Sequence, residues 1–128
     1  MGNQTTAKIL VVDDHVDTNL AVAKLLAQKG YDVRTADSCA SAVAVARAGK
    51  VDLLLCDLGL PDGDGCDLLR ELRAAYGLEG IAITGSGESS DIDRCKDAGF
   101  AAHILKPVHF DRLTATIETV LSGRGKKL

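Results

Sequence analysis

The 128-residue chain has the length of one ordinary domain, and its apolar fraction of 46% is enough for a packed core. Its net charge is −3, from 15 basic and 18 acidic side chains, and its basic cluster (Arg124, Lys126 and Lys127) lies at the very end. This balance argues against a nucleic-acid-binding domain, which would need a basic stripe.

The cysteines and the hydropathy pattern predict a cytoplasmic protein. The spacing of Cys39, Cys56, Cys66 and Cys95 does not match a zinc half-site, so we interpret them as reduced thiols that fill the core. The N-terminus has no charged region followed by a long apolar run, and no apolar stretch is long enough to cross a bilayer. We therefore expect no membrane contact by this domain.

Five short apolar runs alternate with five segments of helical periodicity. The runs cover residues 8–12, 31–36, 51–56, 81–84 and 101–105. Several lack polar alternation, as in Leu53-Leu54-Leu55-Cys56, which is typical of strands buried on both faces of a parallel sheet. The alternation predicts a doubly wound α/β domain with helices on both faces of the sheet and right-handed crossovers.

The first helical segment shows the clearest apolar spacing. Val16, Leu20, Ala23 and Ala27 are predicted to form its buried face. Gly30 follows, at the position where a left-handed cap ends a helix.

The other four helical segments are bounded by capping residues. We expect helices over about residues 38–48, from residue 65, over about residues 88–98 and from residue 110, with Ser38 as an N-cap, Gly49 as a stop and His109 as a weak cap. Their predicted buried side chains are Leu68, Leu69, Leu72, Ile92, Cys95, Phe110, Leu113, Ile117 and Val120. The domain is predicted to cover residues 7–122, with residues 1–6 as a disordered end and residues 123–128 as a flexible basic end or linker.

Polar side chains follow four of the five runs. Asp13 and Asp14 follow the first run, Asp57 the third, Lys106 the fifth, and Thr84 ends the fourth. In open parallel sheets ligands bind beyond the carboxyl ends of the strands, so these five residues are expected to converge. Clustered carboxylates need a cation, and oxygen ligands suit Mg²⁺, while Lys106 supplies positive charge for a phosphoryl group.

The chain resembles the receiver domain of two-component signalling over about residues 7–122. The matching motifs are Val-Val-Asp-Asp at 11–14, Asp-Leu-Gly-Leu-Pro-Asp-Gly-Asp-Gly at 57–65, Thr-Gly at 84–85 and Lys-Pro at 106–107. The resemblance implies a (βα)5 flavodoxin-like fold with the strand order 2-1-3-4-5. It also implies a cis peptide bond before Pro107.

The same resemblance assigns roles to the strand-end residues. Asp57 matches the phosphoacceptor, whose carboxylate takes a phosphoryl group from a phosphohistidine and loses it slowly to water. Asp13, Asp14, Asp57 and the backbone carbonyl of Gly59 match the Mg²⁺ ligands. Thr84 and Lys106 match the groups that bind phosphoryl oxygens.

The switch region departs from the family pattern. The family couples the position of Thr84 to an aromatic residue that here is His103, which we expect to face solvent or a partner. The loop at residues 85–90 is expected to reorganise on phosphorylation.

Gly59 and Ser86 occupy positions that modulate dephosphorylation in the family, and neither is bulky enough to block water. His15, beside the acidic pair, is interpreted as an exposed helix-start residue.

The expected partner is a histidine kinase or a histidine phosphotransfer protein, and a weak homodimer is compatible with the resemblance. The chain is either a stand-alone regulator or, as we prefer, the receiver of a hybrid sensor histidine kinase.

No enzyme activity is expected beyond self-phosphorylation and autodephosphorylation. The alternatives are a Mg²⁺-dependent aspartyl-phosphate phosphohydrolase and an unphosphorylated interaction module. Gly59 argues against the hydrolase, because that class carries a second acid at this position.

Overall fold

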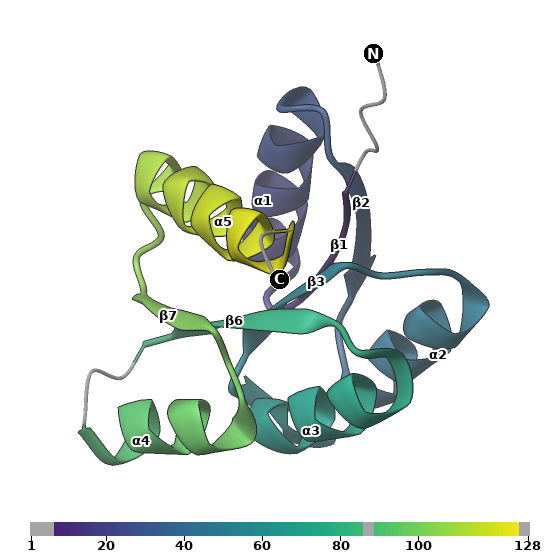
Figure 1. Ribbon diagram of the computed structural model, residues 1–128, viewed down its shortest axis with the longest axis vertical. Helices are drawn as coiled ribbons and strands as arrows, with labels where there is room; N and C mark the ends of the chain where they lie inside the picture. Colours follow the sequence, from purple (N-terminus) through teal and green to yellow (C-terminus); the bar gives the residue numbers. More distant parts are fainter. Residues whose placement is uncertain (1–6, 86–88, 126–128) are drawn as a thin grey trace.

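The computed structural model describes residues 7–85 and 89–125 and contains one five-stranded parallel sheet (Figure 1). Its strands are β1 (Lys8–Val12), β2 (Asp32–Ala36), β3 (Leu53–Asp57), β6 (Glu79–Thr84) and β7 (Ala102–Leu105). Their order, β2-β1-β3-β6-β7, equals 2-1-3-4-5 when these five alone are counted, so the expected topology is confirmed. Two further strands, β4 (Gly59–Leu60) and β5 (Gly63–Asp64), form a small antiparallel hairpin that was not predicted.

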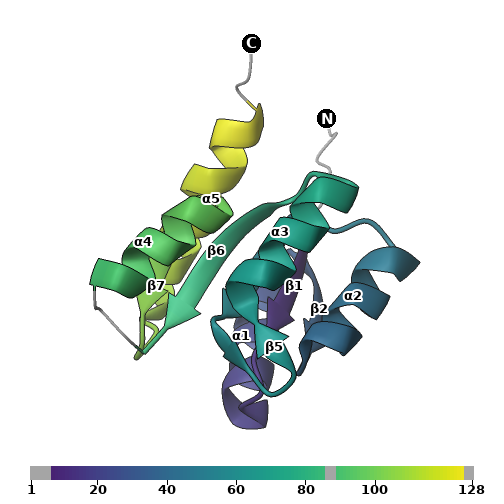
Figure 2. The same ribbon diagram turned by 90° about the horizontal axis from the view of Figure 1, so that it is seen from below.

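Five helices cover the two faces of the sheet. They are α1 (Val16–Gln28), α2 (Cys39–Ala48), α3 (Gly65–Tyr76), α4 (Ser89–Ala98) and α5 (Phe110–Gly125). α1 and α5 lie on one face, and α2, α3 and α4 lie on the other, as Figures 1 and 2 show. The predicted three-layer α/β architecture is therefore present.

The sheet buries both of its faces, which explains the unbroken apolar runs. Leu54 and Cys56 belong to the core under α2, α3 and α4, whereas Leu53 and Leu55 belong to the core under α1 and α5. Successive side chains of a strand point to opposite faces, so each apolar residue of β3 fills one core or the other. The strand reaches Asp57 with no exposed residue before it.

The predicted buried face of α1 is wrong. Its buried residues are Asn19, Val22 and Leu26, while Val16 and Leu20 are 61% and 59% exposed. The helix carries apolar side chains on two adjacent stripes, and periodicity alone does not say which stripe meets the sheet. The sheet accepts the stripe that contains a polar residue, which makes Asn19 unusual.

The helix ends agree with the predicted caps. Gly30, just beyond α1, has φ +100°, and the Ser38 side chain accepts a hydrogen bond from the Ser41 backbone N–H in a capping box. Gly49 follows α2 as predicted, and the carbonyl of His109 accepts a hydrogen bond from the Leu113 N–H in the first turn of α5.

The remaining expectations on the fold have mixed outcomes. All four cysteines are free, and no described helix is long and apolar enough to cross a membrane. Cys39 is partly exposed, whereas the other three are buried. Residues 1–6 and 126–128 of the expected ends, Ser86 and the centre of the loop at 85–90 fall outside the described residues. Residues 123–125, which were expected to belong to the C-terminal end, continue α5.

Candidate functional site

The sheet brings the five predicted strand-end residues to one edge. Asp13 and Asp14 follow β1, Asp57 ends β3, Thr84 ends β6, and Lys106 follows β7. The strands are parallel and in register, so their carboxyl ends meet at the same height. The Lys106 backbone N–H donates to the Thr84 carbonyl at 2.9 Å, which joins the last two strand ends.

Three carboxylates lie close together at this edge. One ligand atom from each of Asp13, Asp14, His15 and Asp57 falls within 4.8 Å of the others. The side chains of Asp13 and Asp57 are only 7% and 12% exposed. Since partial burial strengthens the repulsion between like charges, the carboxylates favour a bound cation, and their oxygens fit the preference of a hard divalent ion.

Lys106 joins two of these carboxylates. Its Nζ lies 3.1 Å from Oδ2 of Asp57 and 3.4 Å from Oδ2 of Asp13. Burial lowers the pKa of Lys106, but the hydrogen bond and charge of Asp57 and the charge of Asp13 outweigh it and leave that pKa raised. The ammonium is therefore protonated at neutral pH and oriented toward the Asp57 carboxylate.

His15 takes part in the acidic cluster, which the sequence did not predict. Its side chain is exposed, as expected, but Nδ1 lies 2.9 Å from Oδ1 of Asp13 and 3.3 Å from Oδ1 of Asp14. The hydrogen bond with Asp13 and the two negative charges raise the pKa of His15. The position of His15 directly after the acidic pair was the available signal.

The β4–β5 hairpin connects the cluster to the helices on one face. The Gly59 N–H donates to Oδ1 of Asp57 at 3.3 Å. At the far side of the hairpin, Asp62 accepts from the N–H groups of Cys39 and Ala40 at the start of α2. Asp64 caps α3 by accepting from the Cys66 N–H, and it pairs with Arg94 of α4. These contacts link the hairpin to α2, α3 and α4, and Figure 2 shows β5 at the start of α3.

His103 lies on β7 opposite Ala82 and is partly exposed. Its neighbour Ile104 belongs to the core under α1 and α5. Because side chains alternate along a strand, His103 is on the face that α4 covers. Its expected role in switching stays a prediction.

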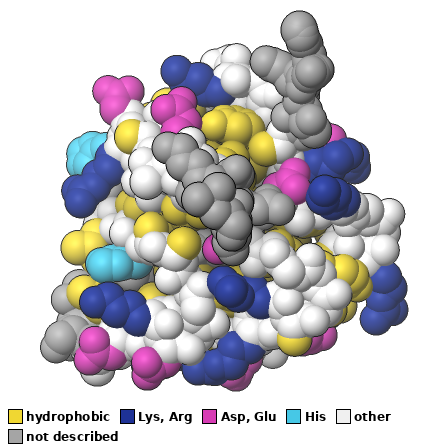
Figure 3. All heavy atoms as spheres, in the orientation of Figure 1, with side chains coloured by type: hydrophobic (Ala, Val, Ile, Leu, Met, Phe, Trp, Pro, Cys, Tyr) yellow, Lys and Arg dark blue, Asp and Glu magenta, His cyan; other side chains and the backbone are white. Residues whose placement is uncertain are grey.

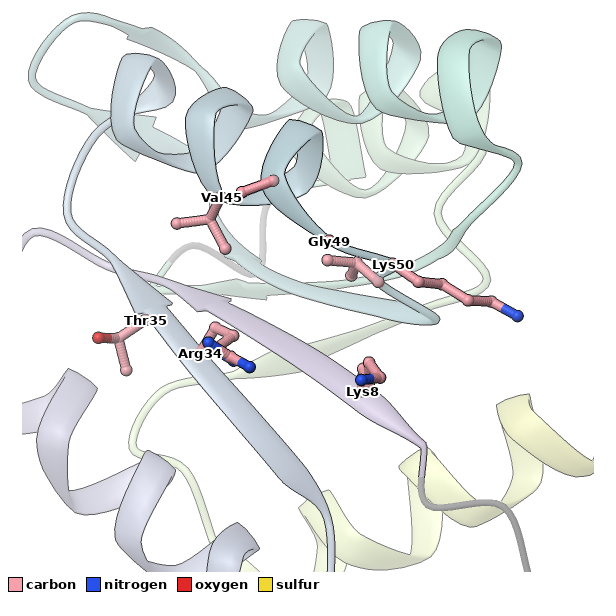
Figure 4. A pocket seen from close by; sticks show the side chains of 8 residues that line it. Lys8, Arg34, Thr35, Val45, Gly49 and Lys50 are labelled. Carbon is pink, nitrogen blue, oxygen red and sulfur yellow. The ribbon is translucent and has the colours of Figure 1, made fainter.

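A separate cavity of about 250 Å³ lies between α2 and the sheet, near the start of β1 (Figure 4). It is lined by Lys8, Arg34 and Lys50, among others. Lys8 and Arg34 share Asp32 as an ion-pair partner, and Lys50 pairs with Asp52, so two carboxylates offset part of the positive charge of these three cations. On the face shown in Figure 3, basic and acidic side chains of the described residues are likewise interspersed rather than gathered in a basic stripe.

A family model described as "Response regulator receiver domain" matches residues 9–118. The match covers most of the chain, and the fold and strand-end residues agree with it. The chain therefore belongs to the response regulator receiver domain family. It is a receiver domain of two-component systems.

Two similar curated proteins illustrate different kinds of relative. The transcriptional regulatory protein KdpE of Staphylococcus aureus is 36% identical over 89% of the chain, and the sensor histidine kinase RcsC of Escherichia coli strain K12 is 31% identical over 93%. The chain spans about half the length of KdpE (49%) and 12% of RcsC. Both relatives are longer than this chain; one is named a transcriptional regulatory protein and the other a sensor histidine kinase.

Solved structures show the same fold over nearly the whole chain. A CheY-like receiver domain protein from Methanospirillum hungatei JF-1 superimposes with a TM-score of 0.90 at 28% identity, covering 95% of this chain and 98% of that one. The non-phosphorylated HemR receiver domain from Leptospira biflexa superimposes with a TM-score of 0.84 at 29% identity. The match covers 91% of this chain and 95% of that one. The predicted fold class is confirmed.

Proposed function

We propose that this receiver domain accepts a phosphoryl group on Asp57 from a phosphohistidine of its partner, with Mg²⁺ held by Asp13, Asp14 and Asp57. The observation that carries the proposal is the placement of the Asp57 carboxylate. It is nearly buried at the end of β3, 3.1 Å from the Lys106 ammonium and within reach of two further carboxylates. A buried carboxylate so placed is poised to react rather than to stabilise the fold.

The chemistry needs alignment and charge neutralisation. An oxygen of Asp57 attacks phosphorus, the bond from phosphorus to the histidine nitrogen breaks, and an acyl phosphate forms. Lys106 then pairs with a phosphoryl oxygen, and the Thr84 hydroxyl is assigned to another. Bound Mg²⁺ supplies the charge that offsets the three carboxylates and the incoming phosphoryl oxygens. The backbone carbonyl of Gly59 is assigned as a further ligand.

Release of the phosphoryl group is assigned to water. A Cβ built at Gly59 would have no atom within 4 Å, so the side of the pocket next to Gly59 is open to a water molecule. We therefore expect slow self-dephosphorylation. The signal is proposed to pass through Thr84 and His103 to α4, and through the β4–β5 hairpin to α2 and α3.

Incubation with acetyl phosphate and Mg²⁺ tests the proposal. Intact-mass analysis is expected to show one added phosphoryl group, and EDTA is expected to suppress the reaction to background because the carboxylates lose their counter-charge. If the wild-type protein gained no phosphoryl group in Mg²⁺, so that its mass equalled that of the EDTA sample, the proposed function would be contradicted.

The exposed apolar side chains of α1 are proposed to contact the phosphohistidine protein. Val16 and Leu20 are more than half exposed and lie in the first turns of α1, directly after the acidic pair. A donor must approach this edge to reach Asp57, and desolvated apolar anchors are what such an interface requires.

Leu20→Asp is expected to slow transfer from a phosphorylated histidine phosphotransfer domain by roughly tenfold, equal to about 1.4 kcal/mol of lost interface free energy. Labelling by acetyl phosphate should be unchanged, since that donor needs no docking. Tyr76→Asp is the matched control, because Tyr76 is also exposed but lies at the far end of α3. Equal slowing by both variants, or slowing with acetyl phosphate, would exclude this docking surface.

A further inference from the structure

Asn19 is a buried polar residue on an otherwise apolar face of α1. It is 6% exposed and lies in line with Val22 and Leu26, which pack on the sheet. Its Nδ2 donates to the carbonyls of Asp13 and Ala36, both at 2.9 Å. These carbonyls follow β1 and end β2, so one side chain joins a helix to two neighbouring strand ends.

The Asn19 amide is only half satisfied. Its Oδ1 is buried and has no hydrogen-bond partner among the described residues. Burial of an unpaired acceptor costs free energy, and an apolar side chain on this face would avoid that cost. The two bonds donated by Nδ2 must therefore contribute something that packing alone does not.

The donated bonds fix the backbone of the acidic pair. The Asp13 N–H donates to the Ala36 carbonyl at 3.1 Å, and Asn19 binds both that carbonyl and the carbonyl of Asp13. Asp13 is thus held on both sides of its Cα. Repulsion from Asp57 and Asp14 would otherwise push this turn outward, since their carboxylate oxygens lie within 4.8 Å.

We propose that Asn19 is a positioning residue that keeps Asp13 and Asp14 in place to bind the divalent cation. The inference rests on the proposed function, because it assumes that these carboxylates hold the metal. It deepens that function by assigning a role to a residue that does not touch the cation. Groups that orient metal ligands in this way commonly control metal affinity.

The test measures metal affinity on the folded protein without phosphorylation. Mn²⁺ serves as the probe, and free Mn²⁺ is counted by electron paramagnetic resonance. Asn19→Leu keeps the branched shape and the number of heavy atoms of the side chain but removes both donated hydrogen bonds, and it is expected to weaken Mn²⁺ binding about tenfold. Val22→Ala is the matched control. Val22 lies one turn further along the same buried face, and its apolar side chain makes no hydrogen bond to the acidic pair, so its affinity should match wild type even though its melting temperature falls.

The outcomes separate this role from a purely structural one. Unchanged Mn²⁺ affinity in Asn19→Leu, or equal weakening in Val22→Ala, would overturn the positioning role. A wild-type protein that binds no Mn²⁺ would overturn the metal site itself and with it the proposed function. If Asn19→Leu does not fold, Asn19→Ser replaces it, since the shorter side chain cannot reach both carbonyls and should weaken binding as well.

Discussion

Asp57→Asn is expected to abolish phosphorylation by acetyl phosphate, with no phosphoryl group detected by intact-mass analysis under conditions that label the wild type. The amide lacks the anionic oxygen that attacks phosphorus. It also removes one of the two carboxylates that Lys106 contacts. The fold should survive, because the amide has the size of the carboxylate and relieves repulsion with Asp13 and Asp14.

Asp52→Asn provides the matched control for this result. Asp52 lies just before β3, at the opposite end of the strand that carries Asp57, and it accepts a hydrogen bond from the Lys8 N–H. Phosphorylation of this variant should equal that of the wild type. Labelling of Asp57→Asn at another carboxylate would show that the acceptor has been assigned to the wrong residue.

Gly65→Ala is expected to lower the free energy of unfolding by about 3 kcal/mol, measured by urea denaturation. A Cβ at position 65 would lie 2.5 Å from the Asp57 carbonyl oxygen and 3.0 Å from the Leu58 Cα. Both are backbone atoms, which cannot turn away as a side chain could. The usual helix preference for Ala over Gly is worth only about 1 kcal/mol, so the clash outweighs it.

Gly49→Ala is the control for Gly65→Ala. Nothing lies within 4 Å of a Cβ built at Gly49, and its φ of −164° is open to any residue. We expect its free energy of unfolding to stay within about 0.5 kcal/mol of wild type. If Gly65→Ala were as stable as Gly49→Ala, the close packing of α3 against the end of β3 would be contradicted. Such a result would also weaken the argument that this packing fixes the Asp57 backbone.

Local pattern was enough to predict the sheet and the elements of the site. The run from Leu53 to Cys56 identifies a strand buried on both faces, and Asp57 follows it directly. Since all five strands of the sheet are parallel, the residues that follow them lie at the same edge of the sheet. The convergence of Asp13, Asp57 and Lys106 could therefore be predicted from the strand order, without further structural detail.

Other features could not be predicted because they depend on contacts between distant segments. Asp62 accepts from N–H groups at the start of α2, a pairing that requires the hairpin to fold back toward that helix. His15 is a local case: its position after the acidic pair was a signal, but its contact with Asp13 depends on how tightly the chain turns between β1 and α1. Neither spacing nor composition carries that information.

The sequence alone determined the alternation of strands and helices, the strand ends that carry carboxylates, and the membership in a family that these imply. Only the tertiary structure decided which face of α1 packs against the sheet. The packed face carries Asn19, and the face with Leu20 is exposed. The physical reason is that this stripe buries Val22 and Leu26 against the sheet and brings Asn19 to the carbonyls at the ends of β1 and β2, contacts that exist only in the folded protein. Those carbonyls become neighbours only when the sheet has formed.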